Sequence, residues 1–369
     1  MIWSTFVIST GLSLTLTPCV IALLRRGQVY DQPNERSSHS RPTPRGGGLA
    51  TALAALIALA ATWTGASGPA VALAFTATGF GIVGMMDDFH DLSANLRLIV
   101  QVVLGAAAAF LLLRGTDLSP LVHGLAMAAI VVWLMSFVNA FNFMDGIDGM
   151  SIAQSAVAGA AWAVLGWASG ESFLLVAGLA QLGAAIGFAP FNVPVAKVFL
   201  GDVGSYFLGG WMGALVVLGL RAGLTPEAVL APLGLYLLDT GTTLFWRIRS
   251  GHEWRRPHRY HVYQRLADHG WSHVRTAGFA AGIIALCALL GGLSESGSLT
   301  GRIIADIGLA LTIIAYLDWP EKTRNEISVK PLPTGGDRTC DPRSPGDGSP
   351  DRLGGHRRRS ESKPFRREG

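Results

Sequence analysis

Apolar runs of about twenty residues recur along this chain and constrain its fold more than any other feature, because each is long enough to cross a bilayer core. Inside a bilayer no water pairs with backbone N–H and C=O groups, so spans of this kind form helices. Only 15% of the residues are charged, whereas a soluble protein usually carries about a quarter. The sequence therefore predicts an all-α polytopic membrane protein with eleven spans, at about 2–24, 47–64, 69–86, 96–113, 120–138, 152–168, 173–189, 205–221, 226–246, 274–293 and 301–319.

The distribution of Lys and Arg predicts the orientation of these spans, because basic residues gather on the cytoplasmic side. With the N-terminus outside, all but three of the 29 Lys and Arg residues lie on the inner side; those outside are Arg114, Arg221 and Arg302. We therefore predict an outer N-terminus and an inner C-terminus. The polar connections then face inward, and a site assembled from them faces the cytoplasm.

Residues 320–369 differ in composition from the rest, since Pro, Gly, Ser, Asp and Arg dominate and large apolar side chains are almost absent. Such a segment cannot bury enough apolar surface to become ordered. We predict a transmembrane catalytic domain over residues 1–319 and a disordered, basic cytoplasmic tail over 320–369. Arg357–Arg359 would each gain about 1 kcal/mol near anionic lipid head groups, but a solvated tail without a role explains them equally well.

The stretch Asn139–Gly149 places amides, carboxylates and glycines directly after the apolar run Leu121–Val138. Carboxylates at the mouth of a membrane helix are expensive and usually functional. The oxygens of Asn142, Asp145 and Asp148 suit a hard cation such as Mg²⁺, or the imide edge of a base. We interpret this stretch as the centre of an active site.

Two other inner segments carry groups that suit phosphate chemistry. Gly46–Gly48 follow Arg45 at the start of a span, and we expect their N–H groups to be free for an anion, although a plain helix-entry turn is an equal alternative. Asp87 and Asp88 lie at the inner end of the third span, with Arg97 one or two turns further on. Adjacent carboxylates repel unless a cation or a shared proton relieves them; a solvated helix end is the other interpretation.

The last two inner segments are a Gly-Asp turn and an arginine-rich loop. Asp202 lies between glycines just before a span, which presents one carboxylate where the backbone can approach closely. The loop 247–275 contains His258, Arg259 and His261; ordinary inside charge explains its arginines but not its histidines. Asp239, inside a span, is expected to turn inward and to pair with a polar group or an arginine.

In this order, the motifs Ser-Ser-His-x-x-Pro-x-Pro-Arg-Gly-Gly-Gly, Asp-Asp, Asn-x-x-Asn-x-x-Asp-Gly-x-Asp-Gly and Gly-Asp-x-Gly-Ser resemble the polyprenyl-phosphate N-acetylhexosamine-1-phosphate transferase family (glycosyltransferase family 4). The resemblance covers about residues 1–320 and is closest to the branch that initiates O-antigen of lipopolysaccharide. It implies transfer of a sugar 1-phosphate from a UDP-sugar to undecaprenyl phosphate, with release of UMP, in a bacterial inner membrane. This step starts the synthesis of lipid-linked cell-envelope glycans.

Carried over position by position, the resemblance implies roles for the motif residues. The expected catalytic residues are Asp87, Asp88 and His261; the metal ligands, for Mg²⁺ or alternatively Mn²⁺, are Asn142 and Asp202; the substrate-binding residues are Arg45, Gly46, Gly47, Arg97, Asp145, Asp148, His258 and Arg259. One departure concerns the last loop, where relatives often place two histidines close together and this chain has Tyr263 after His261.

Two other functions compete with this one. An intramembrane Mg²⁺-dependent prenyltransferase would also use the Asp-Asp-x-x-Asp pattern of Asp87–Asp91, but it leaves the glycine motifs unexplained. A secondary transporter would place acids near mid-membrane, where Asp239 is a partial candidate. The expected partners are a UDP-N-acetylhexosamine or deoxy relative, polyprenyl phosphate and membrane lipids, with no nucleic acid and with a homodimer left open. We further expect the segment Pro257–Arg265 to set sugar choice.

Overall fold

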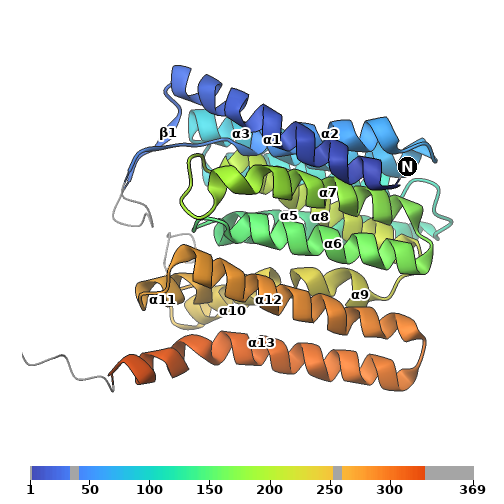
Figure 1. Cartoon of the computed structure of the whole chain (residues 1–369). Coiled ribbons are helices and arrows are strands. Elements are labelled where there is room, and N and C mark those ends of the chain that lie inside the picture. The colour runs from blue at the N-terminus through green and yellow to red at the C-terminus, as the bar shows by residue number, and fades with distance from the viewer. Residues whose placement is uncertain (1, 34–40, 252–259, 329–369) are drawn as a thin grey trace, which may run out of the picture. The chain divides into compact units, whose positions relative to one another are not determined.

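The computed structural model describes residues 2–33, 41–251 and 260–328, and within them it is built almost entirely of helices (Figure 1). The helices are α1 (Ile2–Arg26), α2 (Gly48–Thr62), α3 (Ser67–His90), α4 (Ala94–Leu112), α5 (Pro120–Met144), α6 (Met150–Ser169), α7 (Ser172–Asn192), α8 (Gly201–Arg221), α9 (Pro226–Leu230), η1 (Ala231–Leu233), α10 (Gly234–Arg249), α11 (Val262–Asp268), α12 (His273–Gly292), η2 (Leu293–Ser296) and α13 (Leu299–Ser328). Two short strands, β1 (Tyr30–Asp31) and β2 (Thr43–Pro44), pair antiparallel.

The prediction of an all-α polytopic membrane protein is confirmed. Among the described residues, ten helical segments are long and apolar enough to cross a membrane. The remaining predicted span forms α2, which is apolar but has only 15 residues. The sequence did not indicate α11, a short helix inside the loop 247–275.

The last helix ends later than the sequence suggested. α13 continues through Pro320 to Ser328, and Met1–Ile327 form one compact unit. Residues 329–369 lie outside the described part of the chain, so the disorder expected there stays a prediction.

Helix α8 forms the centre of the protein. It packs most extensively against α3 and also contacts α5 and α2. Between Gly201 and Gly219, Asp202 is the single residue that is not fully buried. A helix that is apolar all round must be surrounded by other helices. Asp202, in the first turn of α8, is therefore the polar residue that this helix presents at its partly exposed end.

Small and hydroxyl-bearing residues join α1 to α7, as is usual between membrane helices. A Cβ on Gly187 would lie 2.5 Å from the backbone oxygen of Thr10, so the two helices are in direct backbone contact there. Ser9 and Ser13 donate hydrogen bonds to the carbonyl oxygens of Ala180 and Ala184, at 2.6 and 2.8 Å. These bonds satisfy hydroxyl groups that lipid could not satisfy.

Candidate active site

Two glycine contacts bring separate inner segments against the first turn of α8. A Cβ on Gly84 of α3 would lie 2.0 Å from the carbonyl oxygen of Asp202, and a Cβ on Gly48 of α2 would lie 2.2 Å from the Cα of Gly204. No other residue fits at either position without moving a helix, because real side chains do not approach backbone this closely. The N-terminal end of α2 and the C-terminal part of α3 therefore pack directly against the first turn of α8, at Gly204 and Asp202.

Backbone hydrogen bonds then fasten the glycine motif to the segment before α8. Phe199 N–H donates to the Pro44 oxygen at 2.8 Å, and Gly47 and Gly48 N–H donate to the oxygens of Phe199 and Leu200, both at 2.8 Å. Gly46 N–H also donates to the Phe199 oxygen, at 3.3 Å.

The expectation that these amides are free to bind an anion is wrong, since all three have backbone acceptors. The glycines at 46 and 47 instead hold Arg45 in place.

Arg45 bridges two carboxylates from different helices. Its Nε lies 2.7 Å from Asp88 Oδ1 and its Nη2 lies 2.8 Å from Asp202 Oδ1. Burial lowers the pKa of Arg45, but the charges of Asp202 and Asp88 outweigh this effect and raise the pKa above its ordinary value. Arg45 is thus a permanent cation at the start of α8, and its side chain is still 32% exposed.

Asp88 acts as a cap for α8 from the neighbouring helix. Its Oδ1 and Oδ2 accept hydrogen bonds from the N–H groups of Asp202 and Val203, at 3.0 and 2.9 Å. These are donors that a helix N-terminus leaves unpaired, and the carboxylate also complements the helix dipole. The Asp88 side chain is only 2% exposed. Its contacts make Asp88 a positioning residue for Asp202 and give no direct support to the catalytic role expected of it.

Asp87 is held in a different way. One of its oxygens pairs with Arg97 Nη1 of α4, and the other accepts the Leu92 N–H at 2.8 Å. The Asp87 and Asp202 carboxyls also interact electrostatically. The predicted pair Asp87 and Arg97 is therefore brought to Asp202, as a cluster rather than as a solvated helix end.

Asn142, at the end of α5, completes this cluster. Its Nδ2 donates to Asp202 Oδ1 and to Ser205 Oγ, both at 2.9 Å. Across residues 2–33, 41–251 and 260–328, no three His, Cys, Asp or Glu side chains are arranged as a metal site. The donor set nevertheless fits a hard cation, because three carboxylates face only two guanidinium groups and one negative charge is left over. Asp202 and Asn142 are the residues that would hold such an ion.

The turn between α5 and α6 supplies the next two acids. Asp148 Oδ2 lies 3.2 Å from His273 Nδ1 of α12 and accepts the Ala196 N–H at 3.3 Å. Gly149 has a φ of 82°, which favours glycine, and its N–H donates to Asn192 Oδ1 at 2.8 Å. Burial raises the pKa of Asp145 to about 6.

The arginine-rich loop is described only in part, and His258 and Arg259 lie outside the described residues. His261 is 3% exposed, and its Nδ1 lies 3.0 Å from Asp239 Oδ1. Asp239 also accepts the Val262 N–H at 3.1 Å and the Tyr316 hydroxyl at 2.9 Å. The expected inward pairing of Asp239 is confirmed. In this arrangement His261 fastens α11 to α10, so its contacts do not support the predicted catalytic role.

Tyr263 lies in the segment Pro257–Arg265 that was expected to set sugar choice, but the structure buries it against another part of the chain. Its side chain is 1% exposed, and its hydroxyl donates to the carbonyl oxygen of Phe143 at 3.0 Å. A Cβ on Gly146 would lie 2.1 Å from that hydroxyl oxygen. Tyr263 therefore docks α11 against the turn that carries Asp145, and an open sugar site would have to use other residues.

Comparison with known proteins supplies an independent result. Residues 70–220 match the model of glycosyl transferase family 4. The chain is 29% identical to a probable undecaprenyl-phosphate N-acetylglucosaminyl 1-phosphate transferase of Bacillus subtilis, over 73% of this chain and 78% of that protein. It is 28% identical to the phospho-N-acetylmuramoyl-pentapeptide-transferase of the same organism, over 76% and 93%. The corresponding enzyme of Oceanobacillus iheyensis is 29% identical over 79% and 97%.

The chain is similar to members of the polyprenyl-phosphate N-acetylhexosamine-1-phosphate transferase family over most of its length. It is a glycosyl-1-phosphate transferase, and the resemblance found in its motifs is confirmed.

Sequence reasoning missed three residues that shape the site of this transferase: Gly84, Asn192 and His273. Gly84 carries a signal, since it lies in the same helix face as the two aspartates that follow it, but its partner on α8 is over a hundred residues away. His273 looked like part of an ordinary basic connection, and only the packing of α12 beside α6 brings it to Asp148.

Proposed function

We propose that this transferase moves a sugar 1-phosphate of the N-acetylhexosamine type from a UDP-sugar to undecaprenyl phosphate and releases UMP. The observation that carries the proposal is the cluster at the start of α8, where Arg45 and Arg97 meet Asp87, Asp88 and Asp202. Both substrates are phosphate anions, and such a cluster can hold a hard cation between two fixed guanidinium groups. A prenyltransferase or a transporter would not require this arrangement.

The reaction needs little covalent chemistry from the protein. An oxygen of the lipid phosphate forms a bond to the β-phosphorus of the UDP-sugar. The bond from that phosphorus to the bridging oxygen breaks, and its electron pair leaves with UMP. Mg²⁺ held by Asp202 and Asn142 would neutralise charge on the diphosphate. Arg45 and Arg97 add fixed positive charge, so positioning and neutralisation supply most of the acceleration.

We assign Asp87 a positioning role. Both of its oxygens are engaged, one by the Arg97 guanidinium and one by the Leu92 N–H. A general base needs an oxygen within reach of the proton that it takes, and a lipid phosphate monoester has no proton that must be removed before attack. Asp87 thus orients Arg97 for the nucleophile.

Asp145 and Asp148 are proposed to recognise the uracil, because carboxylate oxygens accept the imide N–H of the base. His273 and the Ala196 N–H fix the Asp148 carboxylate from the side. This leaves the sugar to be read by residues of the loop 247–275 other than His261 and Tyr263, and the role of Pro257–Arg265 in sugar choice stays a prediction.

The donor is proposed as a UDP-N-acetylhexosamine because the relatives are named as transferases of N-acetylglucosaminyl and phospho-N-acetylmuramoyl-pentapeptide groups. Their identities to this chain, 29% and 28%, do not separate the two classes. The O-antigen branch, a homodimer, and a site facing the cytoplasm of a bacterial inner membrane stay predictions.

The test is a transfer assay with the purified protein, undecaprenyl phosphate, Mg²⁺ and a panel of radiolabelled UDP-sugars. The expected products are UMP and a lipid-linked sugar phosphate in equal amounts. Release of UMP without lipid-linked product, or transfer of a prenyl group, would contradict the proposal. Asp202→Asn is the inactive control.

A further inference from the structure

The face of the molecule opposite the candidate active site contains a cavity of about 360 Å³. It is formed where α3 and α7 begin and where α4 and α8 end. Asp202 and Arg221 are 19 residues apart along α8, which is about 28 Å at the helical rise per residue. The cavity is therefore separate from the carboxylate cluster, and its size lies at the lower end of the roughly 300–1,000 Å³ typical of small-molecule sites.

The charges around this cavity are unusual for its face. Only three arginines lie on that side in the predicted topology, and one of them, Arg302, pairs with Glu227 at 2.8 Å. The other two, Arg114 and Arg221, both line the cavity. Because basic residues are depleted from the outer side of membrane proteins, two of them at one cavity indicate an anionic group there.

The two arginines are linked to each other. Arg221 donates from Nη2 to the carbonyl oxygen of Arg114 at 3.2 Å and from Nη1 to that of Leu112, which caps the end of α4. Since a guanidinium has five N–H groups, Arg221 keeps three further donors. Within the described residues, the Arg114 guanidinium forms no ion pair, and it is exposed.

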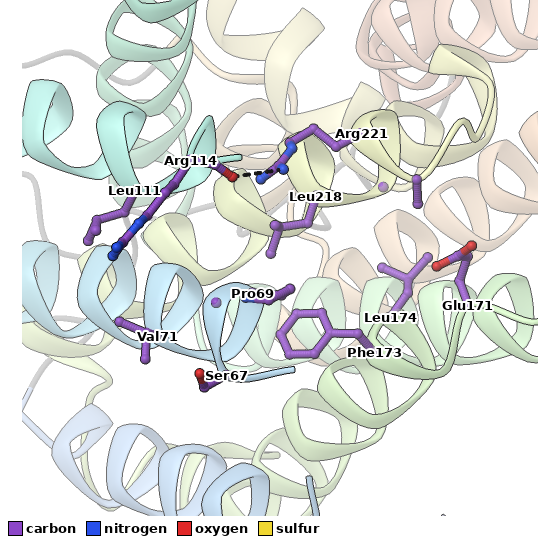
Figure 2. A pocket seen from close by; sticks show the side chains of 13 residues that line it. Ser67, Pro69, Val71, Leu111, Arg114, Glu171, Phe173, Leu174, Leu218 and Arg221 are labelled. Atoms are coloured by element: carbon purple, nitrogen blue, oxygen red, sulfur yellow. Dashed lines mark hydrogen bonds between the residues drawn. The ribbon is translucent and has the colours of Figure 1, made fainter. Parts of the chain in front are cut away.

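A single carboxylate completes the cavity. Figure 2 shows Glu171 on the other side of the cavity from the two arginines, with Leu218 and Phe173 between them. Glu171 also forms no ion pair with any described residue. The walls are mostly apolar, and they lie at helix ends, which is the depth of lipid head groups. A ligand for this cavity needs an anion, a cation and an apolar body.

We propose that this cavity binds the head group of an aminophospholipid from the leaflet opposite the active site. The phosphate lies at Arg114 and Arg221, because guanidinium groups bind phosphate through paired hydrogen bonds. The primary ammonium lies at Glu171, and the glycerol and first acyl carbons lie along Leu218 and Phe173. A choline head group meets the same arginines but cannot donate a hydrogen bond to the Glu171 carboxylate.

The test uses native mass spectrometry of the delipidated full-length protein, titrated with phosphatidylethanolamine, phosphatidylcholine and phosphatidylglycerol of equal chain length. Wild type should bind phosphatidylethanolamine about three- to fivefold more tightly than phosphatidylcholine, the range of a partly exposed ion pair. Glu171→Gln should bring that ratio to about one, and Arg114→Gln should weaken all three lipids. Arg114 is changed rather than Arg221, since Arg221 also caps α4.

Matched controls separate the cavity from general surface charge. Asp117→Asn and Arg302→Gln remove one charge each from the same face without touching the cavity, and both should bind lipids as wild type does. Three results would overturn the proposal: a wild-type ratio of one, a ratio unchanged in Glu171→Gln, or an equal loss in Asp117→Asn. Glycerophosphoethanolamine, which has no acyl chains, should bind far more weakly than the lipid; equal binding would identify a site for a soluble phosphate instead.

Discussion

At the scale of single residues, Asp202 connects the groups of the site, because its Oδ1 accepts hydrogen bonds from both Arg45 and Asn142. Asp202→Asn should leave the protein folded but lower turnover by at least about a hundredfold, because a hard cation loses its main anionic ligand. The measurement is UMP release together with the melting temperature. Asp306→Asn, an exposed carboxylate on α13, is the matched control. Wild-type turnover of Asp202→Asn at sub-saturating Mg²⁺ would remove Asp202 from the metal site.

Arg45 supplies the positive charge that Asp88 and Asp202 share. Arg45→Gln should destabilise the metal-free protein by about 1–3 kcal/mol, because two carboxylates lose their common partner. Mg²⁺ should then raise the melting temperature of this variant more than that of wild type, since the cation replaces the missing charge. Arg45→Lys keeps the charge, so Mg²⁺ should raise its melting temperature by an amount between those of wild type and Arg45→Gln. Equal Mg²⁺ shifts in all three proteins would show that the ion binds elsewhere.

Asp145 makes the stability of the folded protein depend on pH, because burial raises the pKa of its carboxyl to about 6. Above pH 6 the folded protein keeps an ionised carboxylate in a poorly solvated place, whereas below about pH 4 both folded and unfolded chains hold the proton. Asp145→Asn should therefore be more stable than wild type above pH 6, by at most about 3 kcal/mol. The advantage should disappear as the pH falls from 6 towards 4. Melting temperatures between pH 5 and 8 test this, and a gain that is constant with pH would refute it.

At the scale of helices, the site depends on how closely α3 lies against α8. Gly84→Ala would place a methyl group 2.0 Å from the Asp202 carbonyl oxygen, so the helices must separate. We expect a loss of about 1–3 kcal/mol and a larger loss of turnover, because Asp88 and Asp202 move apart. In the control Gly124→Ala, a Cβ on α5 meets open space and should be neutral or slightly stabilising. Wild-type activity in Gly84→Ala would show that the contact is not needed.

Helix positions were predictable from the sequence, whereas contacts between helices were not. Every predicted span became helical because its apolar length decides it, although 226–246 is divided into α9, η1 and α10. α2 begins at Gly48, because Gly47 pairs with Phe199, and it ends at Thr62. The glycine motif suggested free amides because a sequence does not show that Phe199 and Leu200 lie alongside. His261 suggested chemistry for the same reason, as its partner Asp239 lies in another helix. The acids themselves were found, since carboxylates at helix ends in a membrane protein are conspicuous.

At the scale of the whole molecule, the charge distribution predicts which side each connection faces. Asp117 and Lys197 lie on connections at opposite ends of the helices, and both are exposed. In a variant without Cys19, Cys287 and Cys340, Asp117→Cys should react with a membrane-impermeant maleimide in intact cells. Lys197→Cys should react only after the membrane is permeabilised. The reverse pattern would invert the topology and place the active site outside.

The backbone ladder between residues 44–48 and 199–200 also sets an order of events during synthesis. Six helices, α2 to α7, are made between its two sides. At about 5–20 residues per second this takes roughly 8–30 s, during which the amides of Gly47 and Gly48 lack their final acceptors. The site can therefore form only after α8 has been synthesised. A ribosome that stalls before Leu200 leaves the inserted helices without α8, the helix against which α2, α3 and α5 pack.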